Sequence, residues 1–144
     1  MYENMRISKI FVTVDVVLFR LNNSNSEILL IKRKNEPFKD DWALPGGFVD
    51  ENEDLADAAV RELFEETQIQ IKDLEQLQAF GKPFRDPRSH VVTVAFMGCV
   101  PENTIAKASD DAKEAKWFSV NDLPKLAFDH DEIIKFALSK TTTK

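Results

Sequence analysis

Three glutamates lie close together in the segment GGFVDENEDLADAAVRELFEETQIQ, which spans residues 46–70. If residues 54–67 form a helix, a rotation of about 100° per residue places Glu62, Glu65 and Glu66 within an arc of about 100°. Like charges at this spacing destabilise a helix by roughly a few tenths of a kcal/mol per pair. Such an arc is either a solvated acidic face or the oxygen-rich environment that Mg²⁺ and Mn²⁺ prefer.

The residues around these glutamates favour the metal site. The segment LPGG, residues 44–47, precedes the expected helix, and glycine lets the backbone approach a ligand closely. Arg61 is adjacent to the acids and can orient one of them. Glu53 lies near the expected helix start and can pair with Arg61. A bound divalent cation would offset the repulsion among the carboxylates.

The segment resembles the Nudix box, G-x5-E-x7-R-E-U-x-E-E-x-G-U, in which U is a bulky apolar residue. One position departs from the pattern, because Gln68 stands where the motif has glycine. That glycine would serve a left-handed helix end, where another residue costs about 1 kcal/mol. The departure removes no carboxylate. The positions that match are Gly47, Glu53, Arg61, Glu62, Leu63, Glu65, Glu66 and Ile69.

The resemblance implies a hydrolase of nucleoside diphosphate derivatives, with Mg²⁺ as cofactor and Mn²⁺ as a substitute. It implies that Glu62 and Glu66 are the main metal ligands and that the Gly46 carbonyl completes part of the coordination. Glu65 would be a further ligand or would position water, and Arg61 joins Glu65 and Glu66 in the catalytic set. The chemical reason is that a diphosphate is anionic and resists attack by water until a cation neutralises its oxygens.

The general base is not fixed by the motif, since some family members use an acid from a loop outside it. Asp110, Asp111 and Glu114 in the segment SDDAKEAKWF precede a strand near the end of the domain. We prefer Asp111 among them, and a loop acid without a catalytic role is an equally good interpretation.

A wider resemblance covers about residues 36–133 and is to the ADP-ribose pyrophosphatase-like branch of the family. It rests on the segments EPFKDDWALPGGFVD, FRDPRSHVVTVAF and LAFDHDEI, and it implies hydrolysis of ADP-ribose to AMP and ribose 5-phosphate by a homodimer. The branch also resembles the effector domain of Nudix-related transcriptional regulators, whose additional DNA-binding domain we do not expect here. The alternatives are a nucleotide-pool cleaner acting on modified nucleoside triphosphates and a module that senses ADP-ribose without hydrolysing it.

Three arginines are candidates for binding the substrate. Arg85 and Arg88 belong to the loop segment RDPR, and guanidinium groups suit phosphate recognition. The alternative for Arg85 is an ion pair with Asp86 or a surface acid. Arg33 can also face phosphate, and its alternative is a solvated charge on a strand.

The expected elements indicate an α+β layered domain over residues 1–144. The resemblance implies the Nudix fold, a mixed β-sheet sandwiched between α-helices. β-Branched and aromatic runs predict strands at 8–20, 28–34, 74–80, 90–100 and 115–120, with a short strand inside the loop 35–47. The first two strands would form a hairpin around a loop at 21–27. Helices are expected at 54–67 and within 126–140, with Asp54 and Asp129 as capping residues and a frayed tail at 141–144.

Composition excludes several classes of protein. The net charge of −6 argues against a broad nucleic-acid-binding surface. A single cysteine, Cys99, excludes an internal disulfide and fits a reducing compartment. No apolar run approaches the roughly 18 residues of a membrane span, and the N-terminus has no signal-peptide core. We therefore expect a cytoplasmic protein with neither a membrane nor a nucleic-acid partner. The resemblance implies a small nucleotide as its substrate.

Overall fold

The computed structural model describes residues 6–22 and 25–141. Its elements follow the expected order, and it adds a three-residue strand after Pro45 that the sequence did not indicate. The elements are β1 (Ile10–Asn22), β2 (Asn25–Arg33), β3 (Trp42–Ala43), β4 (Gly46–Phe48), α1 (Leu55–Thr67), β5 (Glu75–Phe80), β6 (His90–Val100), β7 (Ala112–Ser119) and α2 (His130–Thr141).

The first two strands form the expected antiparallel hairpin, with Asn22 opposite Asn25. The expected loop at 21–27 is wrong at both ends, because residues 21–22 and 25–27 are paired as strand. Residues 23–24 lie outside the described part of the chain. The expected frayed tail also falls mostly outside it, at 142–144, and Thr141 belongs to α2.

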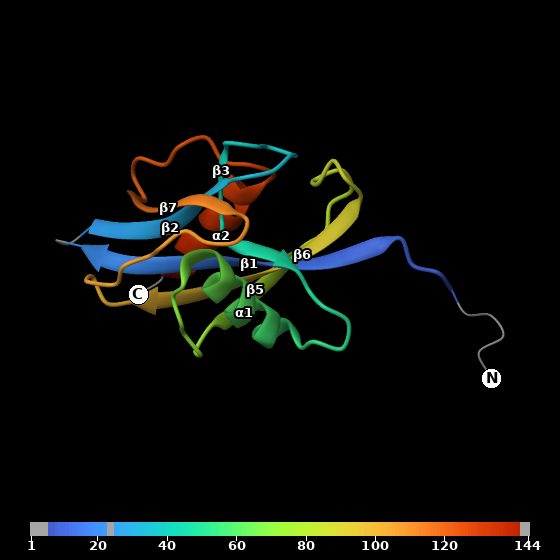
Figure 1. Cartoon of the computed structure of the whole chain (residues 1–144), viewed down its shortest axis with the longest axis horizontal. Coiled ribbons are helices and arrows are strands. Elements are labelled where there is room, and N and C mark those ends of the chain that lie inside the picture. The colour runs from blue at the N-terminus through green and yellow to red at the C-terminus, as the bar shows by residue number, and fades with distance from the viewer. Residues whose placement is uncertain (1–5, 23–24, 142–144) are drawn as a thin grey trace.

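All seven strands join one mixed sheet in the order β3-β2-β1-β6-β5, with β4 paired to β1 and β7 paired to β2 (Figure 1). β6 pairs in parallel with β1 over the whole length of β6, from Ile10 opposite His90 to Arg20 opposite Val100. The other pairs are antiparallel. β1 is central because residues 13–19 are buried on both faces, as its nearly continuous apolar run requires.

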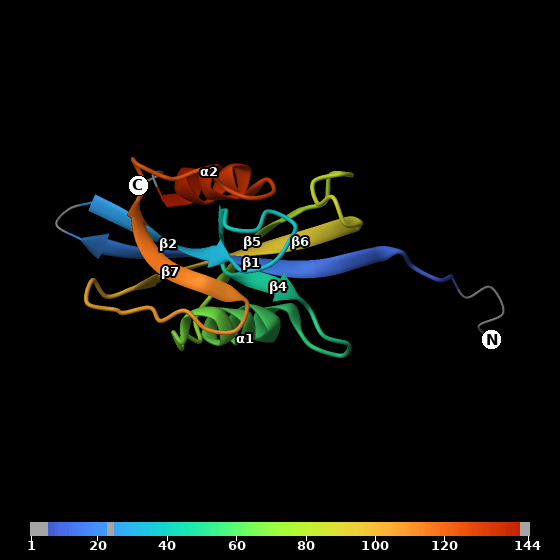
Figure 2. The same cartoon turned by 45° about the horizontal axis from the view of Figure 1, so that its top comes forward.

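The two helices cover opposite faces of this sheet, which confirms the expected sandwich (Figure 2). Alternation along β1 divides its side chains between two cores, since successive residues point to opposite faces. Val16 packs in a core with Leu63 of α1, and Val17 packs in a core with Ile133 of α2. Within the described ranges, no helix is long and apolar enough to cross a membrane.

The ends of the helices agree only in part with the expected caps. Asp54 occupies the N-cap of α1 with extended backbone, but its side chain makes no capping hydrogen bond. Gln68 ends α1 in the left-handed conformation, with φ of 61°, and its N–H donates to the Phe64 carbonyl over 2.8 Å. The capping box expected at the start of α2 does not form, because the carboxylate of Asp129 binds Arg85 instead.

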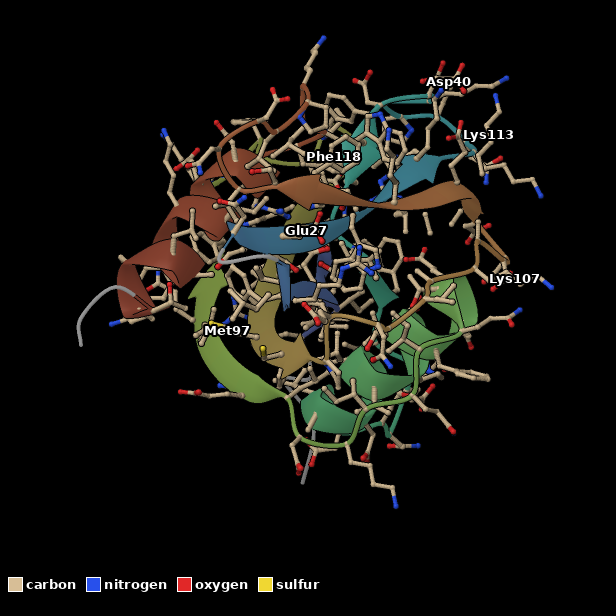
Figure 3. All side chains as sticks on the ribbon, turned by 90° about the vertical axis from the view of Figure 1, so that its left-hand side faces the viewer. Glu27, Asp40, Met97, Lys107, Lys113 and Phe118 are labelled. Carbon is tan, nitrogen blue, oxygen red and sulfur yellow. The ribbon has the colours of Figure 1, made fainter. Side chains whose placement is uncertain are left out.

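The loop between β2 and β3 is tied to the start of β7. Asp40 and Lys113 meet at one corner of the molecule, with 2.8 Å between Oδ1 and Nζ (Figure 3). At the same corner the Arg33 N–H donates to the Asp41 carbonyl over 2.9 Å. These contacts hold the loop across the end of β2, where it contributes to the cavity described next.

Candidate active site

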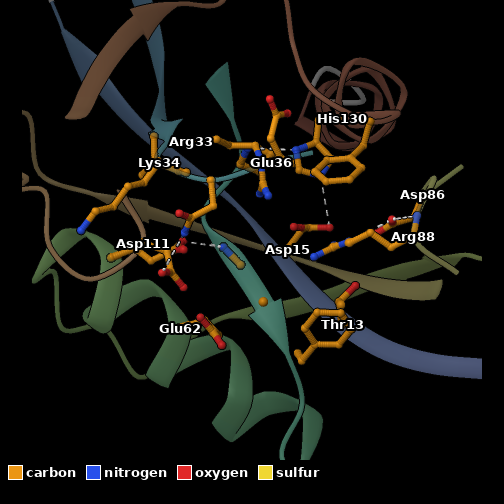
Figure 4. Close-up of a pocket in the computed structure, with 18 of the residues that line it drawn as sticks. Thr13, Asp15, Arg33, Lys34, Glu36, Glu62, Asp86, Arg88, Asp111 and His130 are labelled. Atoms are coloured by element: carbon orange, nitrogen blue, oxygen red, sulfur yellow. Dashed lines mark hydrogen bonds and ion pairs between the residues drawn. The ribbon is translucent and has the colours of Figure 1, made fainter. Parts of the chain in front are cut away.

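A cavity of about 460 Å³ gathers side chains that are distant in sequence (Figure 4). Its wall is built from β1, the end of β2, β4, α1, α2 and the loop at 81–89. The volume lies in the range of small-molecule sites. The cavity has an acidic side on α1 and a basic side formed by arginines from β2 and the 81–89 loop.

The two glycines of β4 bring the α1 carboxylates against the strand. The Gly46 N–H donates to Oε1 of Glu66 over 3.0 Å. A Cβ at Gly47 would lie 2.5 Å from Oε2 of Glu62, so a side chain there would displace this carboxylate. The expected role of the LPGG segment, a close approach of backbone to a functional group, is therefore met by the protein's own glutamates.

Burial disfavours the ionised forms of Glu62 and Glu66 in the metal-free protein. Loss of solvation raises the pKa of Glu62 to about 7, although the Arg61 charge and hydrogen bond oppose the shift. Burial raises the pKa of Glu66 well above its usual value, and the charges of Glu62, Asp111 and Asp15 raise it further against the Gly46 hydrogen bond. A cation between the carboxylates would remove this penalty, because it favours their charged forms.

Arg61 binds the remaining acids of the motif. Its guanidinium holds Glu53 by two hydrogen bonds, Nε to Oε2 at 2.7 Å and Nη2 to Oε1 at 2.9 Å, which confirms the expected pair. Nη1 donates to Glu62 over 3.1 Å and to Glu65 over 3.2 Å. Nη2 also reaches the Phe48 carbonyl at 3.1 Å, which ties α1 to β4. Arg61 thus orients acids rather than facing the cavity.

Not all of the motif carboxylates face the cavity. Among residues 6–22 and 25–141, no three acidic, histidine or cysteine side chains converge as a ready-made metal site. Glu62 and Glu66 line the cavity, whereas Glu65 is held by Arg61 and does not line it. Two carboxylates are a sufficient protein contribution for Mg²⁺, which usually takes its other ligands from water and substrate phosphates. The residues present therefore fit a divalent ion through Glu62 and Glu66.

Arg33 lines the basic side of the cavity. Its Nε donates to the Pro37 carbonyl over 2.7 Å, and its guanidinium carbon lies 5.0 Å from the centre of the Phe128 ring. Burial lowers the pKa of Arg33, and the positive charge of Arg88 lowers it further. Two guanidinium groups in one cavity without a bound anion repel each other, so an anionic ligand between them would be stabilised.

Arg88 lies on the same side and is oriented by Asp86. The guanidinium donates from Nε to Oδ1 at 3.0 Å and from Nη2 to Oδ2 at 2.7 Å, and the backbone N–H of Arg88 binds Oδ1 as well. Its guanidinium carbon lies 5.1 Å from the Phe48 ring and 5.6 Å from the Phe128 ring. Within the RDPR segment, the Asp86 carboxylate thus holds the Arg88 guanidinium at the cavity wall.

Arg85 differs from its expected role in phosphate binding. Its side chain is 4% exposed and donates to Asp129 from Nε at 2.9 Å and from Nη2 at 2.6 Å. Burial alone would lower the pKa of Arg85, but the hydrogen bond and charge of Asp129 raise it. Although Arg85 touches the cavity wall, its donors are engaged in the pair that fastens the loop to α2.

Of the three loop acids, Asp111 is the one that lines the cavity. Its Oδ1 lies 3.5 Å from Nδ2 of Asn35, and its charge contributes to the raised pKa of Glu66. Glu114 instead pairs with Lys32 over 3.5 Å at the surface. Asp111 therefore shares the cavity with Glu62 and Glu66, and its role as general base stays a prediction.

Sequence reasoning missed Asp15 and His130 as residues of the cavity. Asp15 lies on β1 and reaches the cavity between its acidic and basic sides, where Thr93 and His130 bind it. The available signal was an acid in the middle of an otherwise apolar strand, which a fully buried strand tolerates only with partners. Such an acid indicates either a buried polar network or a site.

Residues 11–136 match the NUDIX domain family. The chain belongs to that family. It is 52% identical over 111 residues to the ADP-ribose pyrophosphatase of Methanocaldococcus jannaschii, covering 77% of this chain and 65% of the relative. It is 33% identical over 147 aligned positions to the ADPR responsive transcriptional repressor NtrR of Acinetobacter baylyi, covering 99% of this chain and 59% of the relative. The Nudix chain thus spans less than two thirds of either relative.

A solved structure resembles this Nudix protein closely. The NUDIX domain of Shewanella oneidensis NrtR, in a cocrystal with ADP ribose, superposes with a TM-score of 0.89 at 33% identity. The match covers 98% of this chain and 94% of that domain. The expected Nudix fold is therefore confirmed.

Proposed function

We propose that this Nudix protein hydrolyses ADP-ribose to AMP and ribose 5-phosphate in a reaction that requires Mg²⁺. The observation that carries the proposal is a single cavity lined by Glu62 and Glu66 on one side and by Arg33 and Arg88 on the other. A diphosphate suits this arrangement. A cation held by the carboxylates would neutralise part of its negative charge, and the two guanidinium groups would neutralise the rest. The name of the M. jannaschii relative supports ADP-ribose as the substrate.

In this proposal Glu62 and Glu66 hold the metal ion, with the Gly46 carbonyl as a further candidate ligand. The bound ion would neutralise phosphate oxygens and make water in the site a better nucleophile. Arg61 keeps Glu62 in place through the 3.1 Å hydrogen bond and so acts as a positioning residue. The arginines of the basic side orient the diphosphate for in-line attack.

Asp111 is the proposed acceptor of the proton that the attacking water loses. It lines the cavity near Glu66, and among the residues that the structure describes its carboxylate has only a long contact to Asn35. Glu65 remains a candidate further ligand, and it would need to leave Arg61 to take that role. We do not propose Arg85 as a phosphate ligand, because its guanidinium already holds Asp129.

A second candidate function is binding of ADP-ribose without hydrolysis. It is favoured by the 99% coverage of this chain in its match to the A. baylyi repressor, which is named as ADPR responsive. The cocrystal of the NrtR NUDIX domain with ADP ribose is a further argument. The presence of Glu62, Glu65 and Glu66 at the acidic positions of the motif favours the enzyme.

A substrate panel separates these functions. Purified protein would be incubated with Mg²⁺ and ADP-ribose, NADH, diadenosine polyphosphates or damaged nucleoside triphosphates, and products would be identified by mass spectrometry. We expect AMP and ribose 5-phosphate from ADP-ribose, and no products after EDTA is added. Binding of ADP-ribose without turnover would favour the sensing module, and faster turnover of a damaged triphosphate would overturn the substrate assignment.

We also propose a homodimer. Near the cavity, Phe11 is 50% exposed and Phe48 is 42% exposed, and their rings pack edge to face with centroids 6.2 Å apart. Ile10 adds exposed apolar surface on the same strand. Interfaces take up aromatic side chains of this kind. Light scattering after size exclusion should give about twice the 16.5 kDa of one chain, and a mass near 16.5 kDa would rule the dimer out.

A further inference from the structure

Asp15 is a buried acid whose carboxylate opens into the cavity. It lies on β1 opposite Gly46 of β4, is 7% exposed, and belongs to the cavity lining (Figure 4). Thr93 donates its hydroxyl to Oδ2 over 2.6 Å. Nε2 of His130 lies 3.5 Å from the same oxygen. A carboxylate buried in this way needs donors, and the two donors come from β6 and α2.

The hydrogen bonding of His130 fixes which atom it presents to Asp15. The backbone N–H of Leu44 donates to Nδ1 of His130 over 3.0 Å. Nδ1 is therefore the acceptor nitrogen of a neutral ring, and Nε2 carries the proton. His130 acts as a donor toward Oδ2, so it cannot serve as a base toward this side of the cavity.

The second oxygen of Asp15 lacks a protein partner. Thr93 and His130 both address Oδ2, and no donor among the described residues makes a hydrogen bond to Oδ1. Oδ1 packs against Gly46, where an added Cβ would lie 2.5 Å from it. Oδ1 is not among the described buried polar atoms without a partner, so it is open to the cavity, where water or a ligand can supply its donor.

The chemistry of the substrate limits what that donor can be. Diphosphate oxygens are anionic acceptors, and Asp15 would repel them. In ADP-ribose each phosphate is one methylene away from a ribose, whose hydroxyl groups are donors. Gly46 lies between the two acids: its N–H donates to Glu66, and Oδ1 of Asp15 packs against it. Asp15 is therefore a short distance from the proposed position of the diphosphate.

We infer that Asp15 is a specificity residue that accepts hydrogen bonds from ribose hydroxyl groups adjacent to the diphosphate, with Thr93 and His130 as its positioning residues. This inference rests on the proposed function for the identity of the ligand. It assigns the protein a preference for diphosphates flanked by a hydroxylated sugar. A site built around a substrate hydroxyl discriminates strongly against analogues without it, because the buried acceptor is then unpaired.

Equilibrium binding tests this inference independently of turnover. Calorimetry in EDTA would compare wild type, Asp15→Asn and Asp122→Asn for binding of ADP-ribose. Asp122 is exposed and lies outside the cavity lining, so its variant controls for the change in net charge. We expect Asp15→Asn to weaken binding by about tenfold to a hundredfold, the range for a lost hydrogen bond to a charged group, and Asp122→Asn to leave it unchanged.

Two analogues identify the ribose concerned. One lacks both hydroxyls on the adenosine ribose, and the other lacks the 2- and 3-hydroxyls of the terminal ribose. Wild type should bind one of them at least about tenfold more weakly than ADP-ribose, and for that analogue Asp15→Asn should cause no further loss. If Asp15→Asn lost the same affinity for ADP-ribose and for both analogues, the inference would be overturned. Equal affinity of wild type for all three ligands would overturn it as well.

Four further outcomes have defined meanings. If Asp15→Asn does not fold, the wild-type analogue series still decides the matter. If the variant binds ADP-ribose normally in EDTA but binds Mn²⁺ more weakly, Asp15 is a metal ligand and the inference fails. If wild type does not bind ADP-ribose at all, the inference fails. Binding with the expected selectivity but without turnover in Mg²⁺ would instead refute only the proposed hydrolysis.

Discussion

At the scale of single residues, the acidic side of the cavity is defined by burial of charge. Glu66 accepts a hydrogen bond from the backbone N–H of Gly46, and Glu62 accepts one from the Arg61 guanidinium, yet burial raises the pKa of both carboxylates. The folded protein therefore holds two carboxylates at an energetic cost that a divalent cation would relieve. Two predictions follow from this cost, one for catalysis and one for stability.

Replacing Glu66 with Gln should lower kcat by about a hundredfold or more, by analogy with the loss of one strong electrostatic contact in an active site. The fold should survive, because the amide keeps the shape of the side chain and an oxygen for the Gly46 N–H. Steady-state kinetics at saturating Mg²⁺, with a thermal melt of the metal-free variant, would measure both effects. Turnover close to that of wild type would exclude Glu66 as a metal ligand.

The stability of the metal-free protein should fall as the pH rises from about 4.5 to about 7, because the pKa of Glu62 is raised to about 7 in the folded state. Between these values the folded protein binds more protons than the unfolded chain, so ionisation favours unfolding. Glu66 contributes in the same direction. Urea melts in EDTA across this pH range should show the decline, and Glu62→Gln should reduce it. A pH dependence identical in wild type and variant would contradict the assignment.

At the scale of elements, the end of α1 shows how a departure from a motif is accommodated. Gln68 takes the left-handed conformation that the motif glycine would adopt, with φ of 61°, and still donates its N–H to Phe64. The strained backbone is local, because the side chain of Gln68 is exposed and the helix carries its acids unchanged.

Gln68→Gly should therefore stabilise the protein by about 0.5–1 kcal/mol, since relief of the left-handed strain exceeds the entropy cost of glycine. Gln70→Gly is the matched control. Gln70 is also exposed and is not among the described non-glycine residues with positive φ, so glycine there should destabilise slightly. Urea unfolding of the two variants would test the difference in sign, and destabilisation by both would refute the strain argument.

At the scale of the whole molecule, the cavity exists because loops and helices are fastened to the sheet from both sides. The 81–89 loop is anchored to α2 by Arg85 and Asp129, which are 4% and 14% exposed. This pair holds the segment that presents Arg88 to the cavity. The ion pair is thus structural, and its loss should lower the free energy of unfolding more than it weakens ligand binding.

Arg85→Met should lower the free energy of unfolding by about 3 kcal/mol, because it leaves the largely buried Asp129 carboxylate unpaired. Asp129→Asn should cost less on its own, and the double variant should be more stable than the sum of the two effects predicts. Chemical denaturation of the three variants would measure this coupling. Additive losses, together with a large rise in KM for ADP-ribose in Arg85→Met, would restore Arg85 to phosphate binding.

The sequence by itself determined the features that depend on local spacing. β-Branched and aromatic runs placed most of the strands, and the position of Glu53 near the helix start predicted its pair with Arg61. The motif predicted the left-handed helix end at Gln68. These predictions hold because helix and strand geometry fixes which neighbouring residues share a face, whatever the rest of the chain does. The short strand β4 escaped prediction, since two of its three residues are glycines, which do not favour a strand.

Tertiary structure decided which partner each charged side chain takes. Arg85 was free in sequence to meet phosphate, Asp86 or another acid, and it binds Asp129, 44 residues away. Asp15 and His130 are 115 residues apart in the chain and meet only because β1 is central and α2 packs over it. The choice depends on which groups are buried together, because an unpaired charge is costly only where water is excluded.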